Sequence, residues 1–155
     1  MFLIGFAVIL IGFWFYAMLL GGQTQNFIDV ASLLGILLPL VGVLAATRSF
    51  GVFYAGLRAV VFPKEEITEE MRGRAASLFR LLSKAAAMAA GISVLISFVN
   101  LLMNLDFSYH HPWGVTILGI NMAASMISLI YGLLLIAAVF EPIVFILKKR
   151  YTGKR

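Results

Sequence analysis

Cysteine is absent from the 155 residues, which excludes disulfide bonds, thiolate metal sites and cysteine nucleophiles. Charge is scarce too: Asp, Glu, Lys and Arg make up 12% of the chain, against roughly 25% in an average globular protein. Hydrophobic residues make up 62% of it. A soluble fold of this size cannot bury so much apolar surface, so the composition predicts a membrane protein.

Catalytic signatures are also missing from the sequence. There is no phosphate-binding loop, metal-ligand motif or nucleophile–base pair, so we expect neither an enzyme nor a cofactor. The adjacent residues His110 and His111 do not converge on one ion, and we interpret them as part of a solvated loop.

Long uncharged runs are what the sequence does contain. A membrane-spanning helix needs about 20 mainly apolar residues, and four runs meet that length. The first run lacks a charged leader and a good cleavage site, so we expect a retained helix rather than a secretory signal. The sequence therefore predicts an all-α protein with four spans, at 2–20, 27–47, 85–105 and 113–140.

The basic residues are confined to two segments, 48–84 and 148–155, which hold all 12 Lys and Arg residues. Because basic residues favour the cytoplasmic side, this distribution predicts that both termini lie in the cytoplasm. The connections 21–26 and 106–112 then lie outside. The same distribution explains the net charge of +5, and nucleic-acid binding is not expected.

The inner connection has a simple expected structure. We expect the second helix to continue to residue 62, where Pro63 ends it. A new helix is expected from about Thr68, crossing the connection 63–84 and running on into the third span. The fourth helix is expected to extend to 147, ahead of a basic tail at 148–155. Residues 1–155 thus form one membrane domain.

Polar residues inside the last two spans recur at helical spacing. In the third span they are Ser93, Ser97, Asn100 and Asn104, and in the fourth Asn121, Ser125 and Ser128, followed by Gly132. Each set lies on one helix face, and polar groups facing lipid are costly. The stripes therefore either pack against other helices or line a polar cavity. The cavity-lining candidates are Ser93, Ser97, Asn100, Asn121, Ser125 and Ser128.

No charged residue lies near the middle of a span. Glu141 follows Trp113 by 28 residues, about 42 Å along a helix, whereas the hydrocarbon core is about 30 Å thick. We therefore place Glu141 at the cytoplasmic boundary, ahead of a kink expected at Pro142. If the protein moves ions, the titrating group must come from a partner.

Several segments together resemble the MotA/TolQ/ExbB family. Residues 27–34 (FIDVASLL) resemble the FIDxxSLL opening of the second helix in MotA-type subunits, and 100–105 (NLLMNL) the end of their third. Residues 119–132 (GINMAASMISLIYG) and 140–143 (FEPI) are similar to the fourth-helix pattern GxxMAxALLTTxYG and FxPI. Two spans before the inner connection make the chain more similar to MotA than to TolQ or ExbB.

The resemblance implies the channel-forming A subunit of an ion-driven motor of the bacterial inner membrane. In such complexes five copies surround two single-span B subunits of the MotB or ExbD type, which carry the ion-binding aspartate, and the third and fourth helices line the cavity. The chain lacks the large cytoplasmic domain that engages a flagellar rotor. Family threonines align with Ser128, Leu129 and Val94, which favours protons over sodium.

Two other classes remain open from the sequence. One is a non-conducting membrane scaffold built from several copies. The other is a small-molecule transporter, which is disfavoured because the two halves show no internal repeat. Several small residues permit close helix contact, namely Gly35, Gly42, Ala87 and Gly91. Together with the five copies that the family resemblance implies, they lead us to predict a pentamer.

Overall fold

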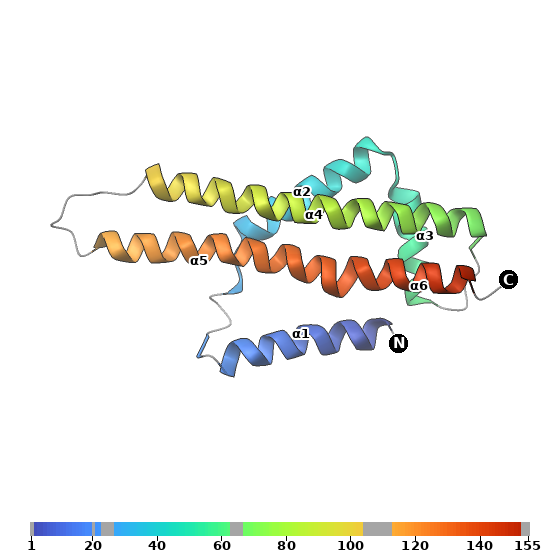
Figure 1. The fold of residues 1–155 in the computed structure, drawn as a ribbon, viewed down its shortest axis with the longest axis horizontal. Helices are drawn as coiled ribbons and strands as arrows, with labels where there is room; N and C mark the ends of the chain where they lie inside the picture. Colours follow the sequence, from blue (N-terminus) through green and yellow to red (C-terminus); the bar gives the residue numbers. More distant parts are fainter. Residues whose placement is uncertain (1, 20, 23–26, 63–66, 104–112, 153–155) are drawn as a thin grey trace.

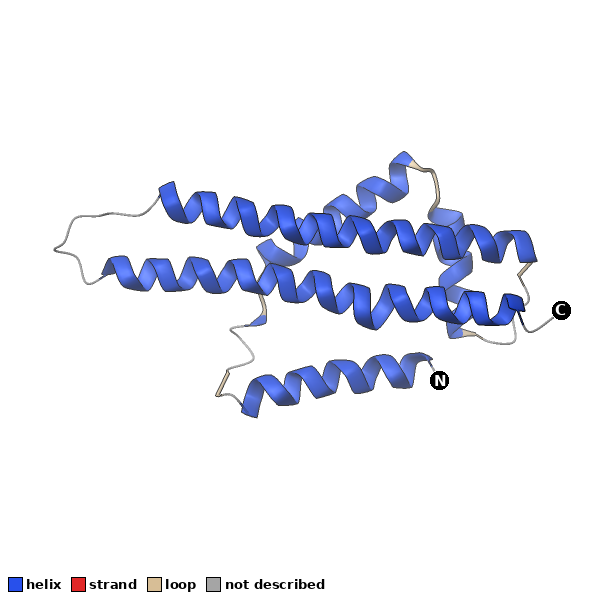
Figure 2. Ribbon diagram, viewed as in Figure 1, coloured by secondary structure: helices blue, strands red, loops and turns tan. Residues whose placement is uncertain are grey.

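The structure, a computed structural model, describes residues 2–19, 21–22, 27–62, 67–103 and 113–152, with side chains throughout except at 113–121, 124 and 150–152. These residues form helices and short connections without any strand (Figure 2), which confirms the all-α prediction. Three helices are long and apolar enough to cross a membrane, or four if one bent pair counts as a span.

The framework is a hairpin of two long rods that lie side by side (Figure 1). One rod is α4 (Glu69–Met103), whose 35 residues extend about 52 Å. The other consists of α5 (Trp113–Leu134), the π-helical segment η2 (Leu135–Phe140) and α6 (Glu141–Thr152). Helix α4 begins after Thr68, which accepts the amide of Met71 at 3.3 Å. The predicted helix from about Thr68 into the third span is confirmed.

The π-helical segment follows from Pro142. Proline has no amide hydrogen, and its ring would clash with the carbonyl four residues earlier in a regular helix. The turn before it is widened instead, and the amide of Glu141 donates to the carbonyl of Ile136. The kink expected at Pro142 therefore takes the form of a local π-turn that keeps the rod continuous.

The other helices pack on this hairpin. Helix α2 (Val30–Ala46) packs on the hairpin through every fourth residue. Its buried residues are Ser32, Ile36, Leu40 and Leu44. Helix α3 (Phe50–Val61) packs on α4 through its buried residues. Helix α1 (Phe2–Leu19) has no buried residue and contacts η2 and α3. The chain termini lie at the same end of the hairpin (Figure 1).

The expected continuous extension of the second helix to 62 is corrected by the structure. Helices α2 and α3 meet at an angle of 113°. Arg48 has φ of 48°, and the amides of Ser49 and Arg48 donate to the carbonyls of Leu44 and Ala45 at 3.0 and 3.1 Å. These two bonds define a Schellman cap, which satisfies the last carbonyls of α2 and turns the chain sharply. Pro63 lies outside the described residues.

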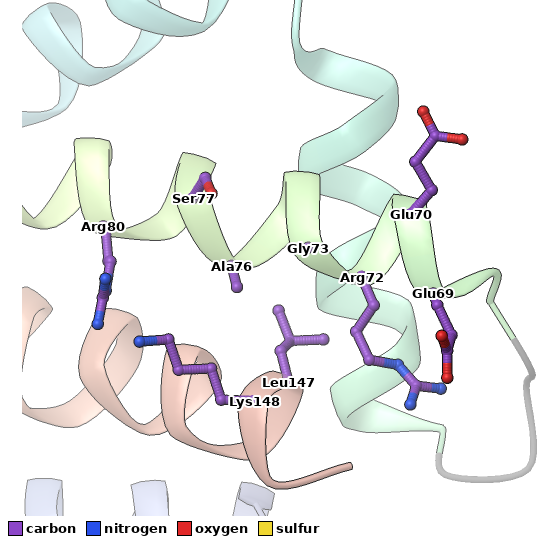
Figure 3. A pocket seen from close by; sticks show the side chains of 9 residues that line it. All are labelled: Glu69, Glu70, Arg72, Gly73, Ala76, Ser77, Arg80, Leu147 and Lys148. Atoms are coloured by element: carbon purple, nitrogen blue, oxygen red, sulfur yellow. The ribbon is translucent and has the colours of Figure 1, made fainter. Parts of the chain in front are cut away.

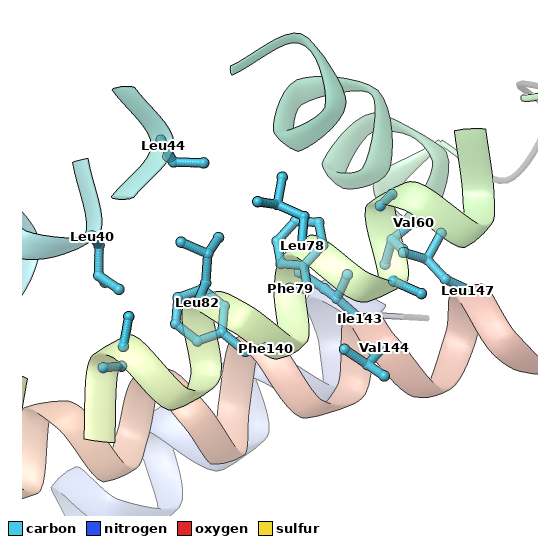
Figure 4. Packing of buried hydrophobic residues seen from close by; sticks show 14 of the residues in the cluster. Leu40, Leu44, Val60, Leu78, Phe79, Leu82, Phe140, Ile143, Val144 and Leu147 are labelled. Carbon is cyan, nitrogen blue, oxygen red and sulfur yellow. The ribbon is translucent and has the colours of Figure 1, made fainter. Parts of the chain in front are cut away.

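The apolar core occupies one half of the hairpin (Figure 4). Phe79 of α4 is fully buried, and its ring lies 5.3 Å from that of Phe53 and 6.2 Å from that of Phe140. Large residues from α2, α3, α4 and α6 belong to the same cluster (Figure 4), namely Leu40, Leu44, Val60, Leu82, Ile143, Val144 and Leu147. The half of the hairpin towards Met103 instead exposes large apolar side chains such as Leu95 and Met126, an arrangement that suits lipid or further helices.

Candidate functional site

A buried hydrogen-bonded chain of side chains joins α2 to α5. Ser128, 2% exposed, donates from its hydroxyl to the hydroxyl of Ser32 at 2.8 Å. The hydroxyl of Ser32 in turn donates to the carboxylate of Asp29. The carboxylate of Asp29 is the last acceptor in this series of bonds, so both hydroxyl groups donate towards it and are polarised in the same direction.

Asp29 also organises the start of α2. Its two carboxylate oxygens accept hydrogen bonds from the amides of Ala31 at 3.1 Å and Ser32 at 3.3 Å, so Asp29 is the N-cap of α2. Tyr131, three residues after Ser128, adds a second link: its hydroxyl donates to the carbonyl of Phe27 and accepts the amide of Asp29 at 3.1 Å. The first turn of α2 is therefore held on α5 by two separate side chains.

The polar stripe of α5 faces the interior of the chain. Ser125 is buried and donates to the carbonyl of Met122 at 2.8 Å. Gly132 is buried against α4, where an added Cβ would lie 2.5 Å from the Cβ of Ala90. Ser128 and Gly132 thus make contacts between helices of one chain, whereas the bond of Ser125 lies within α5. Asn121 lies in α5, but its side chain is outside the described residues.

The stripe of α4 is only partly covered. Ser93 is half-buried beside α2, since a Cβ on Gly35 would lie 3.0 Å from its hydroxyl oxygen. Ser97 is half-buried and Asn100 is exposed, while Asn104 lies outside the described residues. Of the cavity-lining candidates whose side chains are described, Asn100 is exposed, Ser93 and Ser97 are half-buried, and Ser125 and Ser128 are buried.

A second polar link lies near the opposite end of the hairpin. The hydroxyl of Ser83, 8% exposed, donates to the carboxylate of Glu141 at 3.0 Å. This bond connects α4 to the first residue of α6, next to the π-helical segment. Glu141 itself is exposed in the single chain.

These contacts limit what the chain can do chemically by itself. Within the described residues, every buried side-chain nitrogen or oxygen has a hydrogen-bond partner, and no three acidic or histidine side chains gather as a metal site would require. The only carboxylate in the α2–α5 network, Asp29, caps a helix at its end. The network can hold helices in register, but it offers no titrating group in the middle of a described span.

Sequence reasoning missed three of these residues, Ser32, Tyr131 and Ser83. Ser32 was readable as part of the Asp29 cap, because a cap residue commonly bonds the amide three positions later. Tyr131 and Ser83 had no such local signal, since their partners are 104 and 58 residues away.

A comparison with protein-family models and with curated proteins finds no match for this chain. The fold and composition define an all-helical protein with three to four candidate membrane spans.

Proposed function

We propose that this chain is the channel-forming A subunit of an ion-driven, motor-like complex in a bacterial-type inner membrane. Five copies would surround single-span B subunits of the MotB or ExbD type, and protons rather than sodium would be the coupling ion. The proposal rests on the segments that resemble the MotA/TolQ/ExbB family, because they recur in the family's order over most of the chain.

The observation that carries the proposal is the combination of an open apolar face with the lack of a mid-span carboxylate in the described residues. Helices α4 and α5 expose Ile92, Leu95, Ile96, Val99, Met126 and Leu133. Such faces need lipid or further helices. Conduction through this chain would need a titrating group, so a partner that supplies it inside a ring of copies meets both requirements.

Within such a ring the cavity wall would be formed mainly by α4. Ser97 and Asn100 would contribute its polar part, because Ser97 is half-buried and Asn100 exposed, whereas Ser125 and Ser128 are buried inside the chain. This division leaves a cavity less polar than the sequence pattern alone implied. Gly42 and Gly91 have no heavy atom within 4 Å of a built Cβ, so they stay open for close contact between copies.

Topology is the first testable consequence. A reporter fused after Arg155 is expected to be active in the cytoplasm, and one inserted at Gln23 or His110 is expected to be outside, because all basic residues lie in the two proposed inner segments. The two chain ends at one end of the hairpin fit this arrangement (Figure 1). Activity of the C-terminal reporter on the outer side of the membrane would contradict the four-span proposal.

Assembly and flux are the second consequence. Native mass measurement of the purified protein is expected to give five copies, and vesicles that contain the five-copy complex with a single-span B subunit are expected to pass protons. Vesicles with this chain alone are expected to stay tight, because the titrating group is absent. A B subunit whose membrane aspartate is replaced by asparagine serves as the control, and a stable monomer or dimer would contradict the proposal.

The second candidate function is a non-conducting scaffold of several copies. It is favoured by the internal bonding of Ser125 and Ser128, which removes hydroxyl groups from any cavity. The flux measurement separates the two candidates. A five-copy complex that binds its partner but passes no protons would support the scaffold and reject the channel.

A further inference from the structure

A charged cavity lies between the first turns of α4 and the second half of α6 (Figure 3). Its volume is about 500 Å³, and its walls include Arg72, Arg80 and Lys148 together with Glu69 and the buried Leu147. Arg80 and Lys148 come from opposite helices and point towards each other across the opening (Figure 3). Two cationic groups from different helices thus converge on one space.

The charge in this cavity is positive on balance. Three basic residues line it against two carboxylates, Glu69 and Glu70. The carboxylate of Glu70 points away from the cavity (Figure 3) and is bonded to Arg74 at 2.5 Å. The end of the cavity near Arg80 and Lys148 is therefore cationic, and the repulsion between these two groups falls when an anion lies between them.

The position of the cavity along α4 decides which anions can reach it. Arg80 precedes Ala85, where the apolar part of α4 begins, by five residues, about 7 Å along the helix. The headgroup layer on each side of a bilayer is about 5–8 Å thick. Arg80 therefore lies at the depth of phospholipid phosphates, while Arg72, two turns further out, faces the aqueous side.

We propose that this cavity is a binding site for a phosphate group, held between the guanidinium of Arg80 and the ammonium of Lys148. The guanidinium supplies a planar pair of donors that matches two phosphate oxygens, and the ammonium supplies a compact charge from the other side. The proposal concerns α4 and α6 of one chain and does not depend on ion conduction.

Two sources of phosphate fit this chemistry, an anionic phospholipid headgroup and a soluble phosphate. The full-length protein, stripped of lipid in detergent, is titrated with phosphatidylglycerol and with phosphatidylcholine of the same acyl chains, and bound lipid is counted by native mass spectrometry. Inorganic phosphate is titrated separately at constant ionic strength. Preference for phosphatidylglycerol identifies a lipid site, whereas binding of inorganic phosphate that competes with the lipid identifies a site open to soluble anions.

The double variant Arg80→Gln/Lys148→Gln is expected to weaken binding of the preferred probe by roughly 25-fold, since each basic residue near an anionic group contributes about fivefold. The control Lys84→Gln/Lys149→Gln removes the same charge from exposed positions of the same two helices outside the cavity, and it is expected to weaken binding less because both proposed phosphate contacts remain. The exchange Arg80→Lys/Lys148→Arg keeps both charges and should retain binding. All four substituted positions are exposed, so an unchanged melting temperature checks that each variant is folded. Equal weakening by both double variants, or no binding of either probe, overturns the proposal.

Discussion

Gly132→Ala is expected to lower the stability of the helical hairpin by about 1–3 kcal/mol, the usual cost of overpacking. Gly132 lies at a close contact between α5 and α4, where the added Cβ would stand 2.5 Å from the Cβ of Ala90 and 3.4 Å from the carbonyl oxygen of Ala86. Neither neighbour is a flexible side chain, so the helices themselves must separate. Thermal unfolding of the purified protein in detergent, followed by circular dichroism, measures the change.

The matched control is Gly91→Ala on the facing helix. A Cβ there meets no heavy atom within 4 Å, and alanine is a better helix former than glycine by about 0.5–1 kcal/mol. Gly91→Ala should therefore leave the melting temperature unchanged or raise it slightly. If Gly91 lies between copies of the chain, Gly91→Ala is expected to lower the number of copies found by native mass measurement, while the helix content stays the same.

A compensating change tests the contact itself. Ala90→Gly removes the methyl group that the new Cβ would strike, so Ala90→Gly combined with Gly132→Ala should recover most of the stability lost in Gly132→Ala. Residues in direct contact show such non-additive effects, whereas distant ones do not. Strict additivity of the two changes would show that Gly132 does not set the spacing of α4 and α5.

The helices and several of their ends were predictable because their signals are local. Uncharged runs marked the long helices, Asp29 marked the start of α2, and Thr68 preceded the start of α4. Pro142 predicted a distortion of the helix, but it did not predict that the distortion is a π-turn rather than a bend. In each case the cause lies within a few residues of the effect.

The sharp turn between α2 and α3 had no such signal. Left-handed backbone at a helix end usually comes with glycine or asparagine, but here the residue with positive φ is Arg48. An arginine in that conformation is costly by roughly 1–2 kcal/mol, and it is accepted where the surrounding packing offsets the cost. Gly56 of α3 lies against Phe79 and Ala75 of α4, a long-range contact that no local pattern announces.

The polar stripes show a different limit of sequence reasoning. Periodicity correctly groups Ser125, Ser128 and Gly132 on one face of α5, but it does not say what that face meets. The structure supplies α2 and α4 of the same chain as the neighbours. A cavity at the centre of an assembly would have required the same periodicity, so periodicity alone does not separate the two alternatives for these residues.

Ser128→Leu is expected to destabilise the single chain before it affects any flux. Ser128 is 2% exposed, and its hydroxyl contacts that of Ser32 at 2.8 Å, so a leucine side chain has no free volume to enter. The overpacking cost is about 1–3 kcal/mol. Ser128→Ala removes only one interhelical hydrogen bond and is expected to cost about 0.6 kcal/mol, because Ser32 keeps its bond to Asp29.

The control for added bulk is Ala123→Leu, an exposed position on the same helix. It brings a leucine into α5 without filling a buried site, so its melting temperature should match that of the unchanged protein. Melting temperature, native mass and proton flux with a B subunit are measured on all three variants. If Ser128 lined the cavity, the opposite result would be expected: Ser128→Leu would melt and assemble like the unchanged protein and would lose only its proton flux. Loss of stability in Ser128→Leu, with Ala123→Leu intact, would assign the hydroxyl to the contact between α2 and α5 and leave Ser97 and Asn100 as the polar wall of the proposed cavity.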